Sequence, residues 1–122
     1  MSGPSAVAAP PLAPDRWLDA ARALRLAAVD APGVVGLSRS AVFQTQGRGP
    51  AVLGLALSHT ADGRVLADVG IEAEAGADLA ALQRRVHERL VATWARLRTG
   101  APLIVCVHVV DLVGTLAAAA RS

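Results

Sequence analysis

One continuous run from Arg64 to Leu112 constrains the fold of this chain more than any other feature. It begins with alternating apolar and polar residues (RVLADVGIEAEA), continues with apolar residues at helical spacing (DLAALQRRVHERLVATWARLRTG), and ends in a β-branched stretch (PLIVCVHVVDL). Period-two alternation is typical of a strand with one covered face, and spacings of three and four are typical of an amphipathic helix. The run therefore predicts a strand, a helix capped by Asp78 and closed by Thr99-Gly100, and a second strand.

Three further elements are predicted before this run: a helix, a short extended segment over residues 34–37 and the first strand of a hairpin. A helix is expected between the favourable N-cap Asp15 and the helix-stopping pair Pro32-Gly33, because apolar residues recur there at helical spacing: Trp17, Ala21, Leu24 and Ala28. Leu26 falls among the polar positions of this helix. Residues 51–59 alternate and lead through Thr60-Ala61-Asp62-Gly63 into the next strand, which predicts a hairpin. Residues 39–50 show no clear period.

These elements predict an α+β fold: a two-layer sandwich with a three- to four-stranded mixed sheet and two helices packed on one face, in the order α-β-β-β-α-β. The 122 residues suffice for one modest core. We expect a flexible Pro/Ala-rich tail over residues 1–14, a single domain over 15–113 and a short C-terminal tail over 114–122. The last strand is apolar on both faces except for His108 and Asp111, which predicts that it is central in the sheet or covered by a partner.

The composition indicates in which cellular compartment the protein is expected. The single cysteine cannot form an internal disulfide, which favours a reducing compartment and hence the cytoplasm. The first residues lack the basic and apolar regions of a signal peptide. Residues 101–120 are long enough for a membrane helix, but Pro102, His108 and Asp111 interrupt them. We therefore expect no membrane span.

The histidines do not form a metal-binding pattern. His59, His87 and His108 fall on a hairpin end, a helix and a strand, with no cysteine or carboxylate at ligand spacing. His108 is expected to be a half-buried strand histidine that makes one hydrogen bond. No metal or cofactor is predicted.

Other reactive residue types also have structural interpretations. Cys106 lies among apolar strand residues without a cationic neighbour, so core packing is favoured over a nucleophilic role. Glu72 and Glu74 share a strand face as part of a regular polar alternation, which is typical of a solvated sheet face. The stretch Gly47-Arg48-Gly49-Pro50 matches neither a P-loop nor a dinucleotide fingerprint. The sequence therefore predicts no catalytic residues.

The long helix carries the most distinctive surface feature. Arg85, Arg89 and Arg96 fall along one flank, and His87 with Trp94 along the other. One interpretation is a docking edge for an acidic partner or for membrane headgroups, with Trp94 as its anchor. The other is a solvated helix with Trp94 covering the core edge and Glu88 paired to Arg84 or Arg85. The candidate partner-binding residues are Arg85, Arg89, Arg96, Trp94, His87 and Leu26.

Four short motifs together resemble the alkaline-shock, or envelope stress response, protein family. They are Pro32-Gly33-Val34 after the first helix, Glu74-Ala75-Gly76 after the central strand, Thr99-Gly100 after the long helix, and His108-Val109-Val110-Asp111 in the last strand. Ala75 stands where the family has a tyrosine, and residues 39–50 depart from the family pattern. The similarity covers about Trp17 to Val113. The arginine- and alanine-rich, lysine-free composition is similar to that of high-GC bacteria and suits the actinobacterial members of the family.

The resemblance implies a non-enzymatic cytoplasmic protein without a cofactor. Proteins of this kind act at the inner face of the membrane through a small membrane-anchored protein, often self-associate, and serve cell-envelope stress response or homeostasis. The expected partners are therefore protein partners, a membrane anchor among them, and further copies of the chain.

Two alternative functions remain. A small α+β domain with an arginine-flanked helix is compatible with nucleic-acid binding through Arg85, Arg89 and Arg96, although aromatic residues make up only 2% of the chain and its formal net charge is +2. The other alternative is a small-ligand or enzymatic pocket between helix and sheet, for which the sequence offers no convergent polar groups.

Overall fold

The structure of the protein is a computed structural model that describes residues 14–114. Of the predicted tails over residues 1–14 and 114–122, all but Pro14 and Gly114 lie outside the described residues. The elements follow the order α1 (Pro14–Val29), β1 (Val34–Leu37), β2 (Gln44–Thr45), β3 (Val52–Leu53), β4 (Leu55–His59), β5 (Val65–Glu74), α2 (Leu79–Leu97) and β6 (Leu103–Val113). Helix α1 begins at Pro14, one residue before the expected cap Asp15, as suits the fixed φ of proline in a first helical turn.

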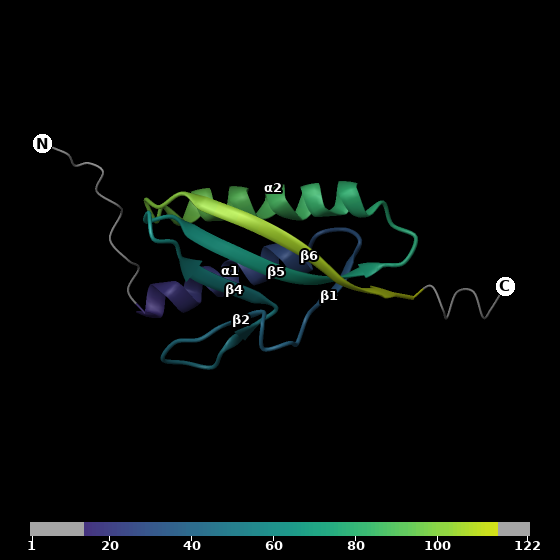
Figure 1. Ribbon diagram of the computed structural model, residues 1–122. Helices are drawn as coiled ribbons and strands as arrows, with labels where there is room; N and C mark the ends of the chain where they lie inside the picture. Colours follow the sequence, from purple (N-terminus) through teal and green to yellow (C-terminus); the bar gives the residue numbers. More distant parts are fainter. Residues whose placement is uncertain (1–13, 115–122) are drawn as a thin grey trace, which may run out of the picture.

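The two helices cover one face of the main sheet and enclose the core between the layers (Figure 1). Every second residue of β5 is fully buried there: Val65, Ala67, Val69, Ile71 and Ala73. The helices contribute the buried residues Leu18, Ala21 and Leu24 from α1 and Leu82, Val86 and Leu90 from α2. The main sheet takes β1, β4, β5 and β6, which confirms the predicted α+β sandwich and its α-β-β-β-α-β order.

Strand β5 is the centre of the main sheet. It pairs antiparallel with β4 through its first half and with β1 through its last residues, and parallel with β6 along its whole length. Strands β4 and β1 therefore share one side of β5, and β6 lies alone on the other. Of the two alternatives predicted for the last strand, a central place in the sheet is wrong, and cover by a partner stays a prediction. Periodicity shows which side chains share a face of a strand, but it does not show whether the strand lies inside the sheet or at its edge.

The hairpin between β4 and β5 closes as predicted, through a turn stabilised by side chains. The hydroxyl of Thr60 bonds to the carboxylate of Asp62 and accepts from the backbone N–H of Arg64, and Gly63 adopts a φ of 85°. Arg64 Nη2 lies 2.8 Å from Asp62 Oδ2. Hydrogen bonds from Arg64 and then Thr60 lower the pKa of the Asp62 carboxyl to about 2.

Helix α2 has the predicted N-cap and a different C-cap. Asp78 Oδ1 accepts a hydrogen bond from the backbone N–H of Ala81 at 3.1 Å, which satisfies one of the free donors of the first turn. The helix ends at Leu97 because Arg98 adopts the left-handed conformation, with φ 52°, and Gly100 supplies a second positive φ of 82° in the turn that follows. A left-handed arginine is uncommon, so the sequence favoured Gly100 as the residue that closes the helix.

Residues 38–54, which include the stretch 39–50 without a clear period, form a loop and a second small sheet of β2 and β3. The single strand predicted over residues 51–59 is divided at Gly54 into β3 and β4. Thr45 is buried and joins this sheet to β4: its hydroxyl donates to Leu55 O at 2.7 Å and accepts from Leu57 N at 3.1 Å. A two-residue strand offers too few positions for a period to be detected. Neither described helix has the length and apolar composition needed to cross a bilayer.

Candidate functional site

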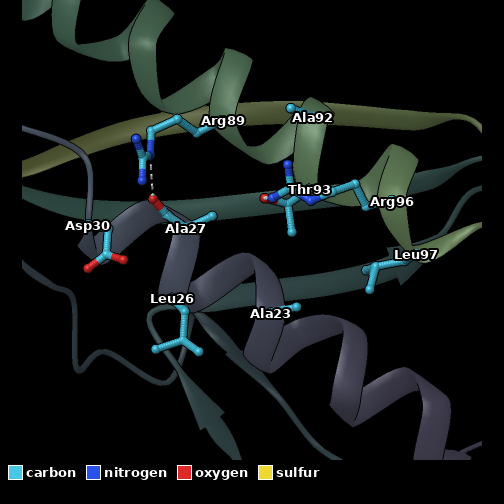
Figure 2. A pocket seen from close by; sticks show the side chains of 9 residues that line it. All are labelled: Ala23, Leu26, Ala27, Asp30, Arg89, Ala92, Thr93, Arg96 and Leu97. Atoms are coloured by element: carbon cyan, nitrogen blue, oxygen red, sulfur yellow. Dashed lines mark hydrogen bonds between the residues drawn. The ribbon is translucent and has the colours of Figure 1, made fainter.

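A groove of about 650 Å³ between α1 and α2 brings together three of the six candidate partner-binding residues (Figure 2). These are Leu26 from α1 and Arg89 and Arg96 from α2. Leu26 is 61% exposed, which confirms its place outside the core. The rest of the lining is mainly small or apolar, with one acidic residue: Ala23, Ala27, Asp30, Ala92, Thr93 and Leu97. The groove is therefore an apolar channel with charges of both signs.

The two helices run antiparallel, and long arginine side chains connect their ends. Arg16 Nη2 donates to Leu97 O at 3.3 Å, and Arg89 Nε donates to Ala27 O at 3.0 Å. Ala27 is among the last four residues of α1, whose carbonyls have no partner within the helix. Arg89 supplies that partner and places a positive charge at the C-terminal end of the helix dipole. It therefore caps α1.

The other two arginines of the predicted flank also have partners within the chain. Arg85 Nη1 donates to Pro32 O at 2.7 Å, just beyond the end of α1. Arg96 Nη2 donates to Thr93 Oγ1 at 3.2 Å on its own helix. Each guanidinium carries five N–H donors, so each retains donors beyond the one bond recorded. The contacts of Arg85 and Arg89 span 53 and 62 positions of sequence, and helical spacing could not have predicted them.

Trp94 and His87 do not join this groove. Trp94 is only 6% exposed, and its indole N–H donates to Ala101 O at 2.7 Å. The interpretation of Trp94 as an exposed docking anchor is therefore wrong, because Trp94 follows Leu90 by four positions and so lies on the buried side of α2. The alternative, that Trp94 covers the edge of the core, agrees with the structure. His87 is exposed on α2 and does not line the groove.

The outer edge of β6 is a second candidate surface. Val65 N donates to Pro102 O at 2.9 Å, so the carbonyl of Pro102 points toward β5. Along a strand, the backbone groups of every second residue point to the same side. The backbone groups of Ile104, Cys106 and His108 thus point toward β5. Those that point away from the sheet belong to Leu103, Val105, Val107 and Val109.

Side chains shield this edge at two places. Gln83 Nε2 donates to Val107 O at 3.0 Å. The β5–β6 register shifts between Val109 and Asp111, so beyond this bulge the backbone groups of even-numbered residues point outward, and there Asp111 Oδ1 accepts from Leu112 N at 2.9 Å. Val110 and Leu112 are exposed apolar residues of the same strand. An edge that offers backbone donors and acceptors is a template on which another strand can pair. The sequence signal for this surface was the apolar character of both faces of the strand.

A polar cluster occupies the face of the sheet opposite the helices. His108 Nε2 lies 2.9 Å from Asp68 Oδ1, which confirms the one expected hydrogen bond, but the His108 side chain is 48% exposed and so is not half-buried as expected. The Phe43 ring lies over this face with its centroid 5.3 Å from that of His108. Gly70 makes room for it, since a Cβ there would come within 2.8 Å of the Phe43 ring.

Cys106 lies on this same open face, opposite Asp68 in the β5–β6 register, and is half-buried. The expectation that it packs in the core is therefore wrong: its neighbours Val105 and Val107 take the core face. In the described part of the chain, no hydrogen bond joins its thiol to His108 or Asp68. Nor do residues 14–114 contain three His, Cys, Asp or Glu side chains grouped as a metal site.

Comparison of the chain with models of known protein families, with curated proteins and with solved structures finds no match. The resemblance to the alkaline-shock family therefore remains a prediction based on the four sequence motifs.

Proposed function

We propose that this protein is a non-enzymatic interaction module that binds a protein partner through the outer edge of β6. The observation that carries the proposal is an 11-residue strand that is apolar except for His108 and Asp111 and that, among residues 14–114, pairs with β5 alone. At about 3.3 Å per residue this edge is roughly 36 Å long. Natural proteins usually keep edge strands short, charged or covered, so a long apolar edge favours a role in pairing.

The chemistry of the edge defines the kind of partner. An extended segment that adds to a sheet gains main-chain hydrogen bonds from the outward backbone groups, here those of Leu103, Val105 and Val109. Apolar side chains on the partner strand gain further contact with Val110 and Leu112, which are exposed beside the edge. The partner is thus an extended, largely apolar segment of a protein.

The cellular setting of the proposal comes from the family resemblance. It places the protein in the cytoplasm at the inner face of the cell membrane, with a small membrane-anchored protein as partner and a role in cell-envelope stress or homeostasis. The lack of a hydrogen bond from the Cys106 thiol to His108 or Asp68, within the described residues, is compatible with a role that does not involve catalysis.

Capture experiments on membrane and soluble fractions test the proposal. The double substitution Val110→Lys/Leu112→Lys places two charges beside the edge without touching the core. Val42→Lys is the matched control, because Val42 is 73% exposed and lies in the loop between β1 and β2. We expect the wild type and the control to retain the same protein, and the β6 variant to retain at least about tenfold less of it.

Two results would contradict the proposal. One is a wild-type protein that is strictly monomeric and retains no protein from either fraction. The other is a β6 variant that retains the partner as well as Val42→Lys does.

A further inference from the structure

The α1 side of the groove has a self-complementary pattern of side-chain sizes. Ala23, Leu26, Ala27 and Asp30 line it at the spacing i, i+3, i+4 and i+7. They form one stripe, because Asp30 directly follows the last residue of α1 and its N–H still bonds to Leu26 O at 3.0 Å. Leu26 is large and mostly exposed, and its neighbour in the stripe, Ala27, is small. A large residue beside a small one is the arrangement that allows two such surfaces to interlock.

The charges of the groove are distributed toward its two ends. Because the helices are antiparallel, Arg89 lies level with Ala27, and Arg96 lies two turns further on, toward the Ala23 end. Asp30 lies at the opposite end of the groove (Figure 2). The ion pairs among the described residues are Arg22–Asp19, Arg64–Asp62 and His108–Asp68, so neither Asp30 nor Arg96 has an ionic partner within residues 14–114.

We propose that this groove binds a second copy of the chain, in a twofold dimer whose α1 helices pack antiparallel. The proposal rests on the proposed function as an interaction module and names one of its partners. A twofold axis through the midpoint of the stripe exchanges position 23 with position 30 and position 26 with position 27. Leu26 of each protomer then packs over Ala27 of the other.

The same axis pairs the charges. Asp30 of one protomer, brought opposite Ala23 of the other, reaches the end of the groove where Arg96 lies. The pair forms twice in the dimer because a twofold interface repeats every contact. Arg96 uses one guanidinium donor on Thr93 and has others for a carboxylate.

This pairing explains the charge pattern better than a foreign acidic helix does. A uniformly acidic partner would satisfy Arg96 and would bring a like charge to Asp30 at the other end of the groove. Like charges brought together at an interface are unfavourable and oppose wrong partners. A second copy in antiparallel orientation offers opposite charges at both ends.

Charge reversal provides a sharp test by sedimentation equilibrium over a concentration series. Asp30→Arg and Arg96→Asp each bring like charges together in a homodimer. We expect each substitution to raise the dissociation constant of the dimer at least about tenfold. An equimolar mixture of the two variants should form a heterodimer, because one of its two contacts is the native pair and the other is the reversed pair. Controls are Glu88→Arg and Arg84→Asp, which alter exposed residues of α2 outside the groove.

The outcomes separate this dimer from the proposed function. Dimers of wild type and controls, monomers of each single variant and a heterodimer on mixing support the interface. A wild type that stays monomeric, a dimer unaffected by both reversals, or single variants that fail to associate when mixed would overturn it. None of these changes lies on β6, so partner capture through that edge is measured independently with the same variants.

Discussion

Replacement of Arg89 by methionine should destabilise the protein, although Arg89 was predicted from the sequence as a surface residue. Methionine retains an unbranched stem with nearly the helix propensity of arginine. The change removes the bond from Arg89 Nε to Ala27 O and the positive charge at the C-terminal end of α1. Arg84→Met is the control, because Arg84 is exposed five residues earlier on α2 and does not line the groove.

The magnitude follows from the partners of the last α1 carbonyls. Asp30 N donates to Leu26 O at 3.0 Å and Ala31 N donates to Ala28 O at 3.2 Å, whereas Ala27 O receives the Arg89 side chain. A hydrogen bond from a charged donor contributes about 1.5–3 kcal/mol when well buried, and less here because the bond is part-buried. The lost dipole interaction adds about 0.3–1 kcal/mol. We expect a total loss of about 1–2 kcal/mol.

Urea denaturation followed by circular dichroism measures this loss. Both variants are compared at the same series of protein concentrations, so that any contribution from dimerisation is separated from intrinsic stability. The free energy of unfolding of Arg84→Met should remain within about 0.5 kcal/mol of the wild-type value. Equal free energies of unfolding for the two variants would refute the assignment of Arg89 as a cap of α1. The Arg89 guanidinium would then be available to bind a partner.

Three other predictions concern residues away from the groove. Trp94→Ala should lower the free energy of unfolding, measured by urea denaturation, by about 3–5 kcal/mol, as expected for a core aromatic residue. A decrease below about 0.5 kcal/mol would indicate that Trp94 is a surface residue. Gly70→Ala should lower the free energy of unfolding by about 1–3 kcal/mol, because a Cβ at position 70 would meet both the Phe43 ring and Ser38 Cβ. Phe43→Ala should remove the part of this loss that comes from the ring, and strictly additive losses would contradict the Gly70–Phe43 contact. Asp62 should titrate near pH 2 by carboxyl NMR, and Arg64→Gln should raise its pKa toward 3.8. Folding lowers the pKa of Asp62, so its ionised form stabilises the protein above about pH 4. This stabilisation is lost as the pH falls toward 2. An Asp62 pKa near 3.8 in the wild type would contradict the prediction.

Local patterns predicted the parts of the fold that depend on local physics. Asp78 caps α2 because an aspartate before a helical stripe satisfies the first free N–H groups, and the β4–β5 hairpin closes at the predicted polar turn. Leu26 is exposed because it lies off the apolar stripe of α1. The strand, helix and strand between Arg64 and Leu112 were all predicted in their order, and β5 and β6 are parallel.

Contacts between distant segments could not be predicted from one sequence. Arg85 and Arg89 fall on one flank of α2, but the carbonyls they bind belong to the end of α1 and the loop after it. Phe43 packs over Gly70 from a segment without a period, and only the sheet brings the two together. The place of β6 at the edge depends on the order of the strands, which alternation along one strand does not encode.

The candidate site was predicted in part for the same reason. The sequence predicted three residues of the groove, Leu26, Arg89 and Arg96, from their place on helix faces. It did not predict that they line one groove, because that depends on the antiparallel packing of α1 against α2. Asp30, which lies at one end of that groove, was not among the candidate residues.

Amide hydrogen exchange along β6 tests the central claim most directly. In the free protein the outward N–H groups of Val105 and Val109 should exchange fast, and those of Ile104 and Cys106, which point toward β5, should exchange slowly. In the complex with the captured partner, Val105 and Val109 should slow at least about tenfold. Outward amides that are already as protected as their neighbours in the free protein, or that do not slow in the complex, would contradict a partner-binding edge at β6.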